Sequence, residues 1–327
     1  HSFPTRRSSD LALVTDPVQS LLWQWVVLAF IGSILLLGVT KGIEAVTKKL
    51  MPLLFLLLLL LCGYSLTLPG AGLALSFLFA PEWHKITPAV VLTAMGLAFF
   101  KLSIGMGTMM TYGSYFTPGQ NIPATATRVM LADLSVSLLA GMAIFPAVFS
   151  FGFAPSAGPS LVFITIPAVF AQIPGGQVLL AAFFILTAIA ATGAMLSIME
   201  VPVVILHERW GLARPRATLL TLLVLMLLGA GCALSQSLLA HIRPGGRTLF
   251  DWADYLSSNL LMPMGGIAIA LFVGWAWGEQ AFAAQLSNQG QLHNRALARA
   301  LCLLLRWVTP VLIGLVMLAG LGVFGSA

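Results

Sequence analysis

Apolar runs recur along the chain and are separated by short polar segments. A hydrocarbon core about 30 Å thick needs roughly 20 apolar residues per helical span. Backbone groups in lipid must be satisfied within their own segment, so runs of this length are expected to be helices. The pattern predicts eight spans, with approximate bounds Leu21–Val39, Leu50–Leu68, Pro88–Phe116, Val129–Phe149, Gly176–Leu206, Thr218–Ala240, Leu256–Gly278 and Ala300–Phe324. The chain is therefore predicted to be an all-α polytopic membrane protein.

One further apolar stretch, Leu161–Ile173, is too short to cross a bilayer. It is broken by Pro167, and Pro174 follows it directly. We expect this stretch to form a re-entrant or cap-like hairpin outside the bilayer, because irregular backbone in lipid is tolerated only where protein or water covers it.

Lysine and arginine fall unequally on the two sides of the predicted spans. One side carries ten of them, namely Lys41, Lys48, Lys49, Arg128, Arg209, Arg214, Arg216, Arg295, Arg299 and Arg306. The other side carries three, which are Lys85, Arg243 and Arg247. Cytoplasmic loops carry an excess of these residues, so the first set is predicted to face the cytoplasm and the short hairpin the outside.

The amino-acid composition also indicates a membrane protein. Only 8% of the 327 residues are charged, whereas about 25% are charged in soluble globular proteins. The cysteines lie inside apolar runs, which predicts neither a metal site nor a disulfide framework. The basic residues punctuate the gaps between spans, so the expected partner is the lipid bilayer and not nucleic acid. The sequence contains no HExxH, nucleophile elbow or P-loop, so no catalytic residue, metal or cofactor is predicted.

The chain opens with the segment HSFPTRRSSD, which is polar and basic and lacks the apolar core of a signal peptide. This segment is similar to translated sequencing-adapter sequence. Residues 1–10 are therefore predicted to be non-native, and residues 11–327 are expected to form a single transmembrane domain that is a fragment of a longer protein.

The segment GLAFFKLSIGMGTMMTYGSY, Gly96 to Tyr115, holds several glycines in an otherwise helical run. Glycine costs about 1 kcal/mol in a helix interior. Close helix packing through small residues is one explanation. The other is a discontinuous helix whose unwound carbonyls and half-helix ends bind substrate and ions. Lys101 favours the second, since an ionisable residue at this depth indicates function.

This segment resembles the sixth helix of the sodium:neurotransmitter symporters. Four more segments also resemble that family and occur in its order: TKGIEAVTKKLMP, AGMAIFP, SLVFITIPAVFAQIPGG and SNLLMPMGG. The resemblance implies a LeuT-type inverted-repeat fold, with the predicted spans corresponding to helices four to eleven. Helices one to three would then lie outside the chain, and residues 88–278 would hold the complete second inverted repeat.

The resemblance also assigns expected roles to individual residues. Phe100 matches the aromatic lid over the substrate, and Ser103 and Gly105 match the unwound stretch that faces it. Met106 stands where the family often has a pocket phenylalanine, and Ile198 matches a pocket-lining aliphatic residue. The gate positions are Asp254 on the outside and Glu208 with Tyr115 on the inside. Core packing and solvated loop acids are the ordinary alternatives for these residues.

The first sodium site of the family takes a small polar residue from helix six and an asparagine from helix seven. In this chain these positions hold Lys101 and Asp133. A paired charge is tolerated at this depth better than a lone one, so we expect an ion pair whose ammonium replaces sodium. A register slip of one residue would put Ala132 at the asparagine position, and Lys101 could also snorkel toward water.

The second sodium site of the family takes a carbonyl and two hydroxyls from helix eight. The matching positions are Ala190, Gly193 and Ala194, which carry no hydroxyl, while Thr192 is one step away. Sodium is therefore possible, but with degraded ligands. Leu97 replaces the glutamine that supports chloride in chloride-dependent members, so chloride coupling is not expected.

The leading hypothesis is a secondary transporter that moves an amino acid or similar small solute across a bacterial inner membrane by alternating access. Its alternatives are a sodium-independent or proton-linked carrier and a non-transporting sensor on the same fold. The degraded ion sites suit the sensor, whereas the retained pocket and gate residues favour the carrier. The oligomeric state is left open.

Overall fold

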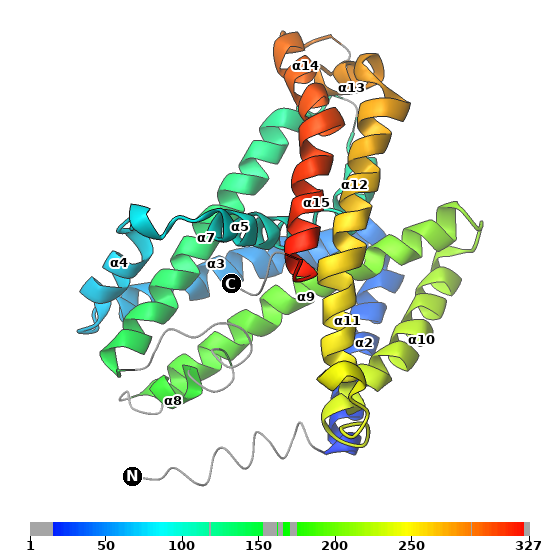
Figure 1. The fold of residues 1–327 in the computed structure, drawn as a ribbon. Coiled ribbons are helices and arrows are strands. Elements are labelled where there is room, and N and C mark those ends of the chain that lie inside the picture. Colours follow the sequence, from blue (N-terminus) through cyan, green and yellow to red (C-terminus); the bar gives the residue numbers. More distant parts are fainter. Residues whose placement is uncertain are drawn as a thin grey trace. The chain divides into compact units, whose positions relative to one another are not determined.

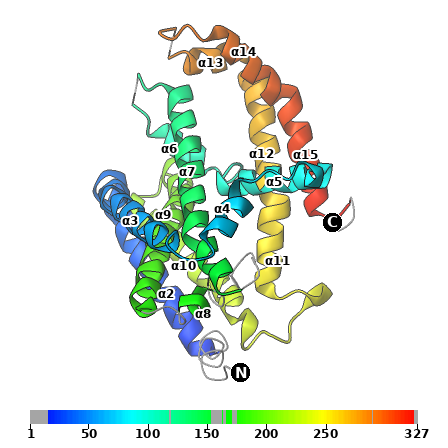
Figure 2. The ribbon, with the colours of Figure 1, turned by 90° about the vertical axis from the view of Figure 1, so that its left-hand side faces the viewer.

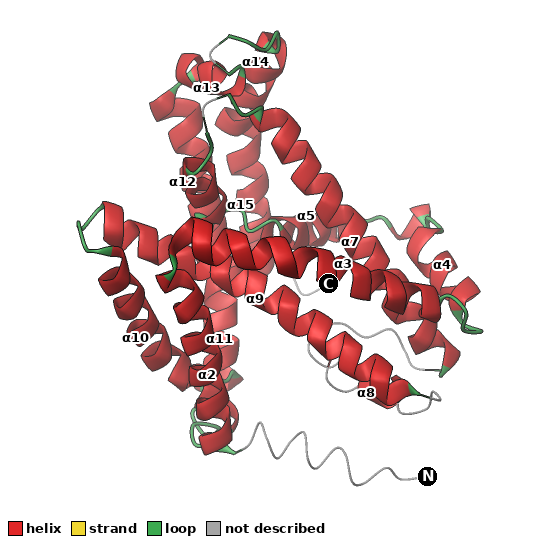
Figure 3. Ribbon diagram, turned by 180° about the vertical axis from the view of Figure 1, so that it is seen from behind, coloured by secondary structure: helices red, strands yellow, loops and turns green. Residues whose placement is uncertain are grey.

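The computed structural model describes residues 16–117, 119–152, 162, 166–170, 175–288 and 290–323. These residues form helices joined by loops, with no strand among them (Figures 1 and 3). The helical elements are α2 (Pro17–Leu36), η1 (Val39–Glu44), α3 (Ala45–Ser65), α4 (Ala71–Phe79), η2 (Trp83–Lys85), α5 (Pro88–Lys101), α6 (Thr108–Ser114), α7 (Ile122–Ser150), α8 (Ile166–Phe170), α9 (Gly176–Glu208), α10 (Arg214–Ala233), η4 (Leu234–Gln236), η5 (Pro244–Gly246), α11 (Leu249–Leu256), η6 (Ser257–Leu261), α12 (Met262–Leu271), η7 (Phe272–Trp277), α13 (Glu279–Leu286), α14 (Arg295–Leu303), η8 (Leu304–Val308) and α15 (Thr309–Gly320).

Seven helical stretches in the described part of the chain are long and apolar enough to cross a membrane. They are Pro17–Leu36, Gly42–Ser65, Ile122–Ser150, Gly176–Glu208, Arg214–Gln236, Leu249–Trp277 and Arg295–Gly320. Each overlaps one predicted span, which confirms a multi-pass all-α membrane protein. The remaining predicted span, Pro88–Phe116, is divided between α5 and α6.

Six of the predicted spans start later along the chain than the helical stretches that they match, and local chemistry explains two of these differences. The span placed at Leu256–Gly278 begins at Leu249, because Thr248 and Asp251 form a capping box. The Thr248 hydroxyl accepts from the Asp251 N–H at 3.1 Å, and the Asp251 carboxylate accepts from the Thr248 N–H at 3.0 Å. The span placed at Thr218–Ala240 begins at Arg214, since a proline fits the first helical turn.

The described chain divides into two compact units. The first comprises His1–Ile43, Pro88–Ile122 and Leu196–Ala327. Within it α2 packs along α10, and α12 packs along α15, which also contacts α5 (Figures 1 and 2). This unit holds both halves of the interrupted helix and the stretch of α12 against which the interruption packs.

The second unit comprises Glu44–Thr87 and Pro123–Met195. Its core is built from buried side chains of α3, α7, α8 and α9, namely Leu58, Leu61, Cys62, Ala143, Ala147, Ile166, Val169, Phe170 and Phe183. Of the predicted hairpin Leu161–Ile173, only Val162 and α8 are described, and α8 contributes to this core. The rest of the hairpin lies outside the described residues, so its position on the outer surface stays a prediction.

Candidate functional site

The helix predicted to be discontinuous is broken. Helix α5 ends at Lys101 and α6 begins at Thr108. Between them Ser103 has φ 53°, Gly105 has φ 87° and Gly107 has φ 82°. The left-handed region is costly for any residue other than glycine, so Ser103 holds this conformation because its surroundings impose it. The prediction of an interrupted helix is therefore confirmed.

The interruption packs backbone against backbone on α12. A side chain at Gly105 would overlap the carbonyl oxygen of Met262, and one at Gly265 would overlap the carbonyl oxygen of Gly105. A side chain at Gly266 would overlap the ring of Phe99. The glycines therefore serve both explanations drawn from the sequence, because they permit the left-handed turn and the close approach at once.

A cavity of about 260 Å³ lies beside the interruption. Its lining comes from α5, η6, α12 and α15, with the residues Gly96, Phe99, Phe100, Ser258, Asn259, Met262, Pro263 and Val316. Phe100, predicted as a lid, is 48% exposed. The lining is mostly apolar and includes two polar residues, Ser258 and Asn259, which is a composition typical of small-molecule sites.

The other predicted substrate residues fall into two places. Ser103, Gly105 and the half-buried Met106 belong to the interruption itself. Ile198 lies on α9, where its side chain is half exposed. The structure thus joins Phe100 to the cavity and places three residues in the unwound backbone, while the pocket role of Ile198 stays a prediction.

The predicted ion-site residues are placed as follows. Lys101 ends α5 in the first unit and Asp133 lies on α7 in the second, and their pairing stays a prediction. Ala190, Gly193 and Ala194 lie on one stretch of α9. The hydroxyl of the neighbouring Thr192 donates to the Ala188 carbonyl at 2.8 Å, so its hydrogen atom is already used within the helix.

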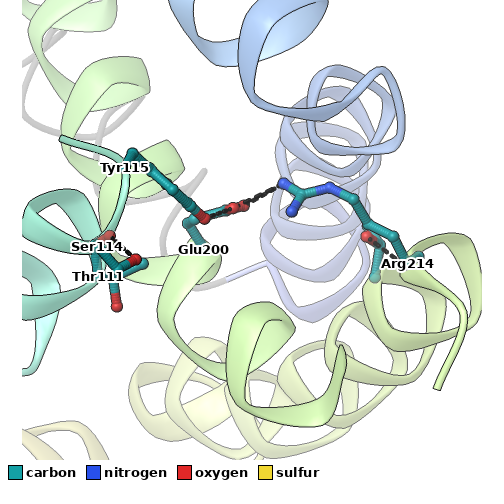
Figure 4. Close-up of polar contacts among 6 residues, drawn as sticks. Thr111, Ser114, Tyr115, Glu200 and Arg214 are labelled. Atoms are coloured by element: carbon teal, nitrogen blue, oxygen red, sulfur yellow. Dashed lines mark hydrogen bonds and ion pairs between the residues drawn. The ribbon is translucent and has the colours of Figure 1, made fainter. Parts of the chain in front are cut away.

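The predicted gate residue Tyr115 belongs to a buried polar network centred on Glu200 (Figure 4). The Glu200 side chain is 0% exposed, and the Tyr115 hydroxyl donates to its Oε1 at 2.6 Å. Nη2 of Arg214 donates to Oε1 at 2.6 Å and to Oε2 at 2.7 Å. Figure 4 shows Tyr115 and Arg214 reaching Glu200 from opposite sides. Three residues earlier in each segment, the side chains of Tyr112 and Ser197 share a further hydrogen bond of 2.8 Å.

The two other predicted gate acids are exposed. Glu208 is the last residue of α9. Asp254 lies on α11, where its carboxylate accepts from the Ser258 hydroxyl at 3.3 Å. Exposure leaves both carboxylates open to partners, and their gate roles stay predictions.

Sequence reasoning did not assign Glu200 and Arg214 to a site. Arg214 was counted among the loop cations because it stands at the start of a span. Glu200 interrupts a long apolar run, and an acid at that depth indicates function on its own. Such an acid is expected to have a buried partner, but only the fold identifies that partner as Arg214.

Comparison with known proteins places this chain clearly. The model of the sodium:neurotransmitter symporter family matches residues 6–326. The uncharacterized sodium-dependent transporter YhdH of Bacillus subtilis is 39% identical over 95% of this chain and 69% of its own length. An uncharacterized sodium-dependent transporter of Haemophilus influenzae is 35% identical over 83% of this chain, which spans only 60% of that protein.

A solved structure supports the same assignment. The crystal structure of MhsT in complex with L-phenylalanine matches with a TM-score of 0.84 and 37% identity, over 98% of this chain and 72% of that one. The fold is thus the LeuT type, and the relatives are transporters and not enzymes. The chain belongs to the sodium:neurotransmitter symporter family.

Proposed function

We propose that this protein is a secondary transporter that moves an amino acid or similar small solute across a bacterial inner membrane by alternating access. The interruption between Lys101 and Thr108 is the observation that carries the proposal. Unwound backbone exposes carbonyl and N–H groups that no helix uses, and such half-helix ends bind substrates and ions in transporters. The cavity beside Phe100 supplies adjoining apolar space.

The substrate class follows from the groups at this position. Backbone N–H and carbonyl groups of the unwound stretch around Gly105 would bind the carboxylate and the ammonium of an amino acid. Met106 in place of an aromatic residue favours a flexible aliphatic side chain, and Phe100 with Ile198 would close the pocket. The relative MhsT was crystallised with L-phenylalanine, which supports an amino acid as the substrate.

The test compares two glycines of the same interrupted helix. Gly105→Ala would overlap the Met262 carbonyl and force a left-handed alanine, whereas Gly113→Ala meets open space in α6. We expect full-length protein in proteoliposomes to take up labelled amino acids in a saturable manner. Gly105→Ala should reduce uptake about tenfold or more, since misplacement by 1 Å in a site has that scale of effect. Equal uptake by both variants would contradict the proposal.

We propose that transport by this protein is only weakly coupled to sodium. A Lys101–Asp133 pair would fill the first site, and Ala190, Gly193 and Ala194 offer no hydroxyl to the second. A coupling ion must bind one state of the carrier better than another, and these residues supply little difference. The relatives named sodium-dependent favour sodium as the coupling ion. The ion-site residues of this chain favour the alternative, which is a proton-linked or uncoupled carrier.

The buried network around Glu200 is proposed to close the inner side of the pathway. Tyr115 directly follows α6 and Arg214 begins α10, so the Glu200 carboxylate links the end of α6 and the start of α10 to α9. Opening of the pathway on the inner side would separate these groups and expose the Glu200 carboxylate to water. Asp254 would serve the outer gate and Glu208 the inner one, each with a partner beyond the contacts described. A sensor that never opens is the remaining alternative.

A further inference from the structure

Arg306 lies in a predicted membrane span, and the described residues offer it no counter-ion. It belongs to the π-helical turn η8, which continues α14 into α15. The ion pairs that the structure gives to arginines in the described residues are those of Arg214 and Arg299. Nε of Arg306 is enclosed and has no hydrogen-bond partner among the described residues. A charged side chain within a membrane span is costly, so an arginine there without a counter-ion indicates a binding partner.

The guanidinium is held in place by tryptophan. It lies over the ring of Trp275 at 4.0 Å from the ring centroid, and the Trp275 indole N–H donates to the Arg306 carbonyl at 3.3 Å. The ring of Trp307 meets that of Trp275 at 4.9 Å in a T-shaped pair. Stacking fixes the plane of the guanidinium without using its N–H donors.

The two helices approach closely to build this cluster. A Cβ at Gly274 would lie 2.8 Å from Cα of Arg306, so only glycine permits the contact. Gly274 belongs to the π-helical turn η7 and Arg306 to η8, and these turns face each other. Single π-helical turns inside longer helices often occur at functional positions. The cluster of Arg306, Trp275 and Trp307 is therefore a formed site and not a chance surface contact.

The surroundings of the cluster suit an amphiphilic ligand, because a cation lies beside exposed apolar side chains. Trp275 and Trp307 are both about half exposed, and apolar side chains are exposed on these turns or directly before them, namely Leu271, Phe272, Leu303, Leu304 and Val308. Tryptophan prefers the level of the lipid headgroups. The charge count assigns Arg306 to the cytoplasmic side, where basic pockets between membrane helices bind anionic headgroups. Arginine matches a phosphate oxygen pair in shape and charge.

We propose that Arg306, Trp275 and Trp307 form a binding site for the phosphodiester of an anionic phospholipid. The phosphate receives hydrogen bonds from the terminal nitrogens of Arg306, and the acyl chains lie along the exposed apolar side chains of η7 and η8. A soluble phosphate ion shares the headgroup chemistry but has no acyl chain, so it would use the cation alone. The site is separate from the interrupted helix and does not depend on transport.

The experiment is native mass spectrometry of the full-length protein in detergent, titrated with phosphatidylglycerol or phosphatidylcholine. We expect phosphatidylglycerol to bind about tenfold more tightly, which corresponds to one charge-assisted contact. Arg306→Gln should abolish that preference. Arg299→Gln is the matched control, because Arg299 precedes Arg306 by two helical turns and already pairs with Glu279 at 3.2 Å. It should leave the preference unchanged.

Four results would overturn the proposal. They are equal binding of both lipids by the unaltered protein, a preference that survives Arg306→Gln, an equal loss in Arg299→Gln, and displacement of the bound lipid by equimolar inorganic phosphate. Should Arg306→Gln fail to fold, Arg306→Lys keeps the charge but loses the planar fork and the stacking. That variant should weaken phosphatidylglycerol binding severalfold, and unchanged binding would contradict the geometry.

Discussion

The buried carboxylate of Glu200 supports a quantitative prediction. Its side chain is fully buried, and its contacts with Arg214 at 2.6 and 2.7 Å and with Tyr115 at 2.6 Å all involve hydrogen bonds to a charged group. Removing one member of a buried pair costs about 3–5 kcal/mol, because the remaining charge stays buried without its counter-ion. We therefore expect Glu200→Gln and Arg214→Gln each to lower the free energy of unfolding by about 3 kcal/mol.

The double variant distinguishes this mechanism from a general loss of packing. With both charges gone, no uncompensated ion remains, and such a replacement is often nearly neutral. The double variant of Glu200 and Arg214 should therefore be damaged far less than the sum of the two singles. Tyr115→Phe removes one hydrogen bond to the carboxylate and should cost about 1.5–3 kcal/mol, while the ion pair itself survives.

A second ion pair in the same unit provides the control. Arg299 and Glu279 approach to 3.2 Å, but their side chains are 73% and 53% exposed. An exposed pair contributes about 0–1 kcal/mol because water screens it. The same double-mutant cycle on this pair should therefore give little coupling.

The assay is reversible unfolding of the full-length protein in mixed micelles, titrated with a denaturing detergent and followed by helix content. Coupling at the Glu200 pair should exceed that at the Glu279 pair by about 2 kcal/mol or more. Additive effects within about 0.5 kcal/mol at Glu200 would refute the reasoning, since independent sites behave in that way.

Three further predictions concern other parts of the chain. Lys101→Ala and Asp133→Ala should each destabilise the full-length protein by about 3–5 kcal/mol and the double variant by much less, measured by the same unfolding assay; additivity would show that the two side chains do not meet. Uptake into proteoliposomes should persist when potassium or choline replaces sodium, and a steep saturable sodium requirement would contradict the proposed coupling. Gly70→Ala should cost about 1–3 kcal/mol through overpacking, because its Cβ would lie 2.7 Å from the Pro146 carbonyl oxygen, whereas Gly72→Ala meets open space and should be neutral.

The fold followed from the sequence because membrane helices are specified by few variables. Length, apolar content and the need for internal hydrogen bonds located each of the long spans. Hydropathy placed the start of a span too late where polar residues form a helix cap. Thr248 and Asp251 look like loop residues by hydropathy, yet together they begin α11. The capping pattern was present in the sequence and outweighs hydropathy at that boundary.

Parts of the candidate site could be predicted from local sequence, whereas other parts depend on residues that are distant along the chain. The interruption near Gly105 was predictable because glycine and an ionisable residue are local signals. The Glu200 network was not predictable, because its three members lie just after α6, within α9 and at the start of α10. Arg306 was counted among the cytoplasmic cations at the end of a span, and its stacking on Trp275 became evident only from the fold, in which the two helices approach closely at Gly274.

The interruption is best understood as a property of two segments together. Gly105 and Ser103 supply the left-handed turn, but an isolated turn of this kind would be strained and short of partners. Gly265 and Gly266 remove the side chains that would keep α12 away, so the unwound backbone packs closely on a helix. These two segments, GLAFFKLSIGMGTMMTYGSY and SNLLMPMGG, also carry much of the family resemblance in the sequence. The two segments that carry the resemblance are therefore in physical contact. The glycines of α12 let that helix pack against the unwound backbone that is proposed to bind the solute.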